Sequence, residues 1–275
     1  MKTPSRRRVK TPRDGVGARA QDLELVRGEL LWTLATLAGD MSPIGPGWSF
    51  RTPALPLVWS LNQIRITAPA SAPDVVALAD EHQAGLPYRH IVVDDMPEAA
   101  EIADDFSRAG WQVDREVLMS LTDPPDRVVD TSRVTELSED QMLSLVRRWA
   151  SEDHPGVGED ALDQLDEYNR GEGRLWQEQR LGVLDRDGNP VAITKLRAHG
   201  RMSWVEDVYT VAEARGQGAA RALVTHATEL ARRSPSDVTF IIADDNDWPK
   251  ELYARIGFRP IGFELTFHRA VGQDR

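Results

Sequence analysis

Residues 204–224 read WVEDVYTVAEARGQGAARALV, a stretch in which a strand-like pattern and a helix-like pattern meet at two glycines. Its first part is rich in β-branched and aromatic residues, which predicts a strand, and Leu223 and Val224 open the apolar face of a helix that starts near Gly218. Between them, Gly216 and Gly218 permit a tight turn and leave no side chain over the backbone amides. The free N–H groups and positive dipole end of such a helix favour an anion. The pattern therefore predicts a strand–turn–helix unit that binds a phosphate or pyrophosphate.

Two common phosphate-binding turns do not fit this stretch. A Walker-type loop requires Gly-x4-Gly-Lys-Ser/Thr, which the sequence lacks. A dinucleotide fingerprint requires Gly or Ala at the position of Arg221, after the first strand of a βαβ unit. Both alternatives are excluded.

The turn resembles the acyl-CoA signature of the GNAT superfamily of N-acetyltransferases. That signature, Gln/Arg-x-x-Gly-x-Gly/Ala, is matched by Arg215, Gly218 and Ala220. Further along, Asn246 and the segment Leu252-Tyr253-x-x-x-Gly257-Phe258 are similar to the second motif of the same superfamily. The resemblance covers residues 131–269 well and the first 130 residues only faintly.

The resemblance implies that acyl-CoA, here acetyl-CoA as donor, lies in a V-shaped split between two central strands. Backbone groups of one strand would pair with the pantetheine arm as an added strand does, and the amides of the turn would hold the pyrophosphate. The residues that would bind the donor are Val208, Tyr209, Thr210, Arg215, Gly216, Gln217, Gly218, Ala219, Ala220, Arg221 and Asn246.

Acyl transfer needs an acid for the departing thiolate and a base for the incoming ammonium, because a Lys-like amine has a pKa of about 10.4 and is unreactive when charged. The resemblance places Tyr253 as the acid; the alternative is a core tyrosine with a bonded hydroxyl. Glu206 is the first candidate for the base, and Asp207 and Asp244 are further candidates. Glu206 could instead be a surface carboxylate or a partner of a nearby arginine, Arg197 or Arg201.

Composition excludes several function classes. The 275 residues carry a net charge of −11, which argues against a general nucleic-acid binder. The sequence has no cysteine, which excludes disulfides, thiolate metal sites and an acyl-cysteine intermediate, and fits a cytoplasmic location. The six histidines show no i, i+4 pair, so no metal site is expected. The longest apolar stretch, 30–38, is too short to cross a bilayer.

Three parts of the chain are expected. Residues 1–20 hold seven basic side chains and one acidic, which predicts a disordered basic tail. Residues 21–130 would form a smaller α/β domain, an accessory or a degenerate GNAT-like one, in which 41–56 reads as a loop and 58–66 as a strand. Residues 131–275 would form the catalytic domain, a mixed α/β fold whose central mixed sheet has helices on both faces.

A weak internal repeat links the two larger parts. Ile-Val-Val-Asp-Asp at 91–95, a helix and Ala-Gly-Trp at 109–111 parallel Ile-Ile-Ala-Asp-Asp at 241–245, a helix and Ile-Gly-Phe at 256–258. The repeat suggests that the first part is a diverged copy of the second.

These observations favour an N-acetyltransferase that moves an acetyl group from acetyl-CoA to a primary amine of a small molecule, as a monomer or homodimer. One alternative is a non-catalytic acyl-CoA-binding regulatory module. Another is a tandem acyltransferase that acts on a peptide or other acceptor. The acceptor pocket comes from variable loops, so the sequence does not name the amine.

Overall fold

The computed structural model describes residues 15–271, so 1–14 of the expected tail lie outside the described residues. Residues 15–20 are helical rather than disordered, because the first helix already begins at Gly15. The helices are α1 (Gly15–Leu37), α2 (Ala72–His82), α3 (Ala99–Arg108), α4 (Glu139–Asp153), α5 (Glu159–Leu175), α6 (Ala219–Arg233) and α7 (Pro249–Ile256), with short 3-10 turns η1 (Trp59–Leu61) and η2 (Ala212–Ala214). The strands are β1 (Asp40–Pro43), β2 (Gly47–Arg51), β3 (Ile64–Ile66), β4 (Tyr88–Asp94), β5 (Gln112–Leu121), β6 (Val134–Glu136), β7 (Gln177–Leu184), β8 (Pro190–His199), β9 (Met202–Thr210), β10 (Val238–Asp244) and β11 (Phe258–Ala270).

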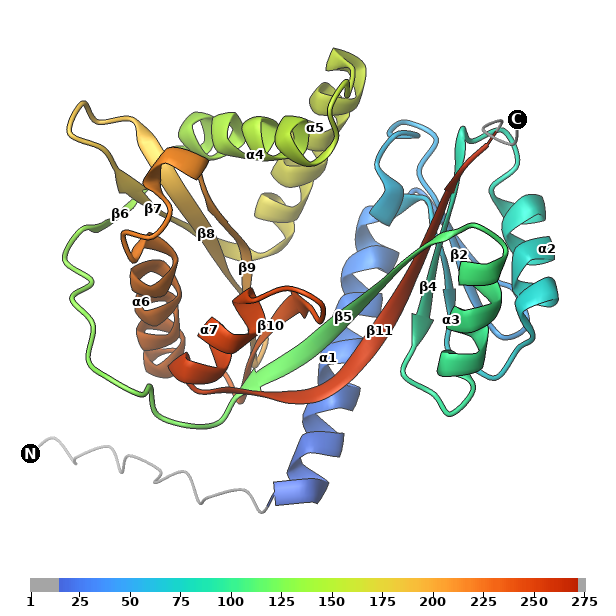
Figure 1. The fold of residues 1–275 in the computed structure, drawn as a ribbon, viewed down its shortest axis with the longest axis horizontal. Helices are drawn as coiled ribbons and strands as arrows, with labels where there is room; N and C mark the ends of the chain where they lie inside the picture. Colours follow the sequence, from blue (N-terminus) through green and yellow to red (C-terminus); the bar gives the residue numbers. More distant parts are fainter. Residues whose placement is uncertain (1–14, 272–275) are drawn as a thin grey trace, which may run out of the picture.

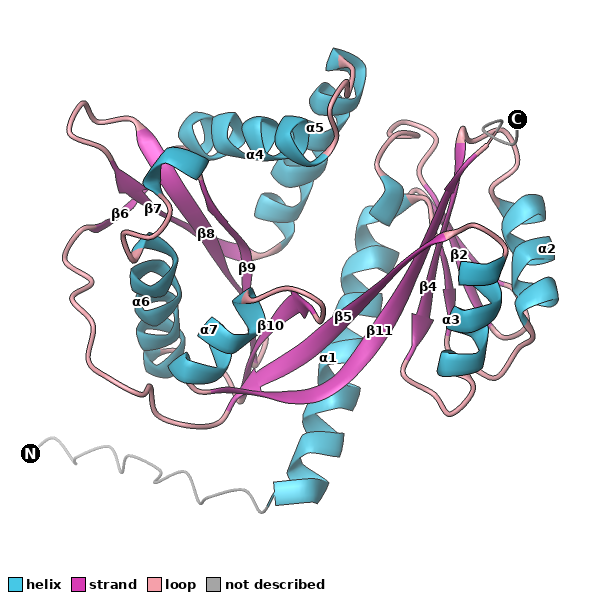
Figure 2. Ribbon diagram, viewed as in Figure 1, coloured by secondary structure: helices cyan, strands magenta, loops and turns pink. Residues whose placement is uncertain are grey.

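The described strands form a single 11-stranded mixed sheet in the order β1-β2-β3-β4-β11-β5-β10-β9-β8-β7-β6. The pairs β3/β4 and β9/β10 are parallel, and the other neighbours are antiparallel. Helices cover the sheet on both faces, as Figures 1 and 2 show. The predicted mixed α/β class with a helix-flanked sheet is confirmed.

The two halves of the chain exchange strands at the middle of the sheet. The internal repeat corresponds to two β–α–β units, β4–α3–β5 and β10–α7–β11. The last strand of each unit leaves its own half: β5 pairs with β10, and β11 pairs with β4. The long strands β5 and β11 also pair with each other and join the two halves, as Figure 1 shows in green and red. The sheet is therefore continuous across the boundary that the sequence predicts near residue 130 between the two larger parts of the chain.

Successive residues of β5 point to opposite helical layers. Val117 and Met119 pack with α6 and α7, while Leu118 packs against α1 with Val26 and Leu30. On the face away from α6, α4 covers the outer strands of the second half. Within this sheet, β9 separates from β10 after Val205 while it stays paired with β8.

The sequence expectation for 41–66 was wrong in two places. The segment 41–56 contains the β1–β2 hairpin, because Gly47 serves a close strand contact rather than a loop: a Cβ there would overlap the carbonyl of Arg65. The segment 58–66 is a strand only at its end. Asn62 donates to the carbonyls of Leu55 (2.8 Å) and Val58 (2.9 Å), and these bonds hold the preceding backbone in a turn.

Candidate active site

The strands β9 and β10 separate part-way along their length. Their parallel register runs from Met202 opposite Val238 to Val205 opposite Ile241. Beyond this point β9 bulges at Asp207, whose φ is +53°, and β10 continues beside β5. Within the part of the chain that the structure describes, no strand pairs with the edge of β9 at residues 206–210 that faces β10. The result is an open strand edge inside the sheet.

The glycine turn follows this open edge directly. Gly216 and Gly218 both have φ of +75°, a conformation that an L side chain strains to adopt. Gly218 is the N-cap of α6. Among residues 15–271, no group accepts a hydrogen bond from the backbone amides of 216–221. The turn thus presents six backbone amides that have no acceptor within the described residues, at and just before the start of α6, and anion binding there stays a prediction.

The side chains of the two arginines at the turn, Arg215 and Arg221, differ in exposure and in hydrogen-bond partner. Arg215 remains largely exposed and donates to the carbonyl of Thr210 at 2.9 Å. Arg221 is 10 % exposed, and its guanidinium donates to Asp126 at 2.7 Å. This hydrogen bond, with the charge of Arg221, lowers the pKa of Asp126. Arg221 thus faces the turn with its amide, while its side chain anchors the segment that enters the second half.

The candidate base Glu206 lies in a buried ionic network. It pairs with Arg197, a fully buried side chain that also donates to Glu172 (2.8 Å) and Glu178 (3.0 Å). Burial raises the pKa of the Glu206 carboxyl well above its usual value, and the charge of Glu172 adds to the shift, whereas Arg197 opposes it. The pairing with Arg197 considered from the sequence is present. It orients a carboxyl whose pKa is raised by burial, and perturbed titratable groups of this kind cluster at functional sites.

Asp207, the second candidate base, has the opposite electrostatic environment. Its carboxylate pairs with the buried Lys195, which also donates to Asn169. Burial alone would raise the pKa of Asp207, but Lys195 and then Arg197 lower it. When the environments of two neighbouring carboxyls move their pKa values apart, the one with the raised pKa is suited to act as a base and the one with the lowered pKa stays ionised. This separation favours Glu206 as the proton acceptor.

The candidate acid Tyr253 lies on α7, which follows β10 on the other side of the split. Tyr253 is 5 % exposed. Its ring packs edge-on against the ring of Phe258, with the ring centroids 6.4 Å apart. Burial, with the nearby charge of Asp247, raises the pKa of its hydroxyl. That hydroxyl forms no hydrogen bond within the described residues. Tyr253 is both a core side chain and a neutral phenol with a proton to donate.

The other predicted residues at this end lie on the surface of the turn after β10. Asn246 is exposed and donates its backbone N–H to the carboxylate of Asp244 at 2.7 Å. Asp244 is therefore engaged in shaping this turn. Trp248 is 60 % exposed at the start of α7.

Sequence reasoning named Arg197 as a possible partner of Glu206 but missed the rest of the buried network, Lys195, Glu172 and Glu178. Lys195 and Arg197 stand at alternate positions of the mostly apolar and buried strand β8, which places both on one face. Two cations on the buried face of a strand require carboxylate partners, and α5 supplies one of them, Glu172. The two-residue spacing of Lys195 and Arg197 could therefore have predicted a buried ionic network from the sequence.

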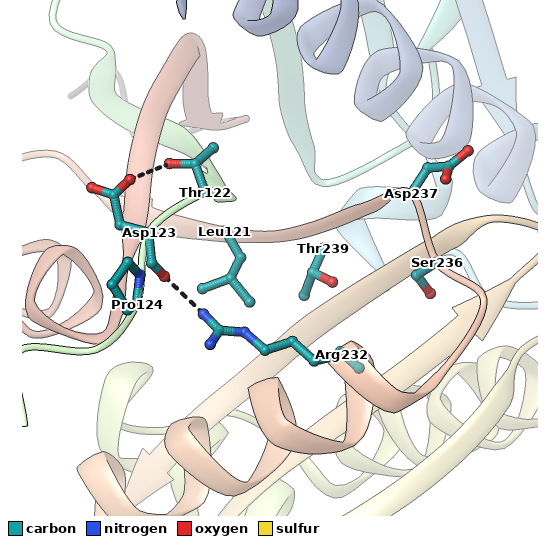
Figure 3. A pocket seen from close by; sticks show the side chains of 9 residues that line it. Leu121, Thr122, Asp123, Pro124, Arg232, Ser236, Asp237 and Thr239 are labelled. Carbon is teal, nitrogen blue, oxygen red and sulfur yellow. Dashed lines mark hydrogen bonds between the residues drawn. The ribbon is translucent and has the colours of Figure 1, made fainter. Parts of the chain in front are cut away.

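A pocket of about 340 Å³ lies away from this site. It is formed at the C-terminal end of α6, where Arg232 donates to the carbonyl of Asp123 at 2.7 Å (Figure 3). The glycine turn lies at the opposite end of the same helix. In the described range, no group of His, Asp or Glu side chains is placed to hold a metal ion, and no helix has the length and apolar character needed to cross a membrane.

Comparison with known proteins agrees with this geometry. Residues 143–258 match the model of the acetyltransferase (GNAT) family. The chain carries a GNAT acetyltransferase domain. No curated protein matches the sequence. The recognition made from the glycine turn is confirmed, and a GNAT domain supports acyl transfer as the general activity.

Solved structures share the fold beyond this GNAT domain. A GCN5-related N-acetyltransferase from Kribbella flavida is 17 % identical, with a TM-score of 0.59 over 90 % of this chain and 95 % of its own. A conserved protein of unknown function from Staphylococcus epidermidis is 13 % identical, with a TM-score of 0.65 over 85 % and 94 %. A tandem GNAT protein from the clavulanic acid biosynthesis pathway is 12 % identical, with a TM-score of 0.52 over 78 % and 76 %. The fold shared with tandem GNAT proteins fits a two-part chain.

Proposed function

We propose that the chain transfers an acetyl group from acetyl-CoA directly to a primary amine of a small molecule. The open edge of β9 at 206–210, continued by the free amides of 216–221, is the observation that carries this proposal. An extended pantetheine arm hydrogen-bonds to such an edge as an added strand. The pyrophosphate then accepts hydrogen bonds from the amides at the start of α6.

In the proposed reaction the carboxylate of Glu206 accepts a proton from the bound ammonium. The amine lone pair attacks the thioester carbonyl, whose oxygen takes the negative charge and is stabilised by a backbone N–H of the open edge. The C–S bond then breaks and the thiolate takes a proton from the Tyr253 hydroxyl. The acetylated nitrogen gives up its second proton to the Tyr253 phenolate, so that Tyr253 is restored and Glu206 holds the one proton released overall. The products are the acetamide and CoA. The absence of cysteine supports direct transfer and a cytoplasmic location.

Calorimetry with acetyl-CoA tests the donor site. Gly216→Asp places a carboxylate in the turn, and Asp tolerates a positive φ better than most residues. We expect the affinity for acetyl-CoA to fall roughly 10- to 100-fold, the value of a few charge-assisted hydrogen bonds. Gly85→Asp is the control, because Gly85 has a similar φ of +82° and equally open surroundings in the other half of the chain. Absent binding by the native protein, or equal losses in both variants, would contradict the donor site.

A non-catalytic acyl-CoA-binding module is the second candidate, favoured by the ion pair that holds Glu206 on Arg197. Both candidates bind acetyl-CoA, but only the enzyme releases free thiol when an amine is added. A thiol assay over a panel of primary amines, polyamines and short peptides separates them and tests the acceptor class.

A further inference from the structure

A groove of about 410 Å³ lies between the two halves of the chain, and one of its lining residues, Tyr168, is hydrogen-bonded to the network of Glu206. Its walls come from α1, from residues 55–61 and from α5. The backbone N–H of Leu57 donates to the side chain of Gln164 at 2.8 Å, which fixes the loop of one half to the helix of the other. The apolar lining consists of Leu37, Leu55, Leu61, Leu175 and the ring of Tyr168. An apolar segment would be well desolvated here.

Tyr168 connects this groove to the candidate base. Its hydroxyl donates to Oε1 of Glu172 at 2.7 Å, and Oε2 of Glu172 accepts from Arg197 at 2.8 Å. Arg197 in turn pairs with Glu206. The groove and the proposed site of proton transfer therefore share one continuous set of side-chain contacts.

The charge of this network favours a cationic ligand. Two buried cations, Lys195 and Arg197, face four carboxylates, Glu172, Glu178, Glu206 and Asp207. An added ammonium would balance part of this negative excess in a region of low dielectric. Arg174 and Glu167, which also line the groove, form an exposed ion pair with each other at 3.0 Å and so add no net charge to its wall.

Resting on the function proposed above, we infer that this groove binds the apolar body of the acceptor. The substrate class is a primary amine with an unbranched aliphatic segment, whose ammonium lies against the network of Glu206 and whose hydrocarbon part lies between α1 and α5. The first half of the chain then determines acceptor specificity, while the second half holds the donor and the reacting groups.

A homologous series of straight-chain amines, from ethylamine to octylamine, tests this inference. With saturating acetyl-CoA, thiol release gives kcat/KM for each amine. We expect kcat/KM to rise about fourfold for each methylene buried, until the groove is filled. Acylation that does not depend on chain length would overturn the inference.

Gly171→Leu provides the structural control, because Gly171 lies on the groove wall of α5. A Cβ there would meet Leu37 at an ordinary contact of 3.6 Å, and glycine-to-leucine exchange within a helix favours folding. The longer side chain would fill the groove, so we expect octylamine to fall to the kcat/KM of the short amines while the affinity for acetyl-CoA stays native. Gly28→Leu, at an exposed position of α1 with open surroundings, should keep the native length dependence.

The outcomes distinguish this inference from the function on which it rests. Thiol release with equal kcat/KM along the series, or equal series for the two leucine variants, overturns the groove assignment and leaves the acetyltransferase intact. Acetyl-CoA binding without thiol release from any amine overturns both. A length dependence that Gly171→Leu removes and Gly28→Leu retains supports the groove.

Discussion

Tyr253 and Glu206 belong to the two segments that diverge at the split, and each has the pKa direction that its proposed role needs. The buried phenol stays protonated at neutral pH and can give its proton to a thiolate. Tyr253→Phe keeps the ring packing and removes only the hydroxyl. We expect kcat to fall by about 10²-fold, a typical value for a lost general acid, with the Kd for acetyl-CoA nearly unchanged. Stopped-time thiol assays and calorimetry measure the two quantities, and a native kcat would remove Tyr253 from the mechanism.

Glu206 predicts a pH dependence. A base must be ionised, and burial raises the pKa of this carboxyl, so kcat/KM should fall as the pH drops through that raised pKa and level off above it. Glu206→Gln keeps the side-chain shape and Arg197 keeps two other carboxylates. We expect a loss of about 10²-fold and the disappearance of the acidic limb from the pH profile. If Asp207→Asn removes that limb and Glu206→Gln does not, the base is Asp207.

At the scale of elements, the strands β5 and β11 place Glu116 directly opposite Glu264. Arg65 donates to the carboxylate of Glu264 at 2.7 Å, and like charges opposite each other across strands are unfavourable. Burial and the carboxylate of Glu264 raise the pKa of Glu116 to about 8. The folded protein thus keeps a proton on Glu116 that the unfolded chain loses at its ordinary pKa of 4.5.

This raised pKa makes stability depend on pH in a defined direction. The unfolded chain releases the proton above pH 4.5 and the folded protein only near pH 8, so folding stability declines as the pH rises through that window. Glu116→Gln removes the titrating group and should flatten the decline. Urea unfolding between pH 5 and pH 9 measures the effect. Glu136→Gln, on the exposed edge strand β6, is the control and should decline like the native protein.

Elements fixed by local sequence could be predicted, whereas those fixed by long-range contacts could not. The glycine turn and α6 were predicted because the backbone requirement of Gly216 and Gly218 is local. The exchange of β5 and β11 was not predicted. The residue pattern of each strand is compatible with pairing in either half, and the actual partner depends on contacts between residues far apart in the sequence. The groove was missed for the same reason, since its walls come from helices far apart in the chain.

At the scale of the whole molecule, the exchanged strands predict that the halves unfold together. Phe106 packs in the first half against Phe267 of β11, with ring centroids 4.3 Å apart, and is almost fully buried. Phe106→Ala should cost about 3–5 kcal/mol. Because β11 also pairs with β5, and β5 pairs with β10, that loss should extend to the proposed acetyl-CoA site in the other half.

Two probes of thermal unfolding check this cooperativity: overall circular dichroism, and the temperature at which acetyl-CoA binding is lost. In the native protein both transitions should coincide, as they do for a two-state unit. Phe106→Ala should move both down together, although the substituted residue lies far from the glycine turn in the sequence. Exposed Glu101→Ala on the same helix should move neither. A binding site that survives at the native temperature while circular dichroism shows early loss of structure would mean that the halves fold independently despite their shared sheet.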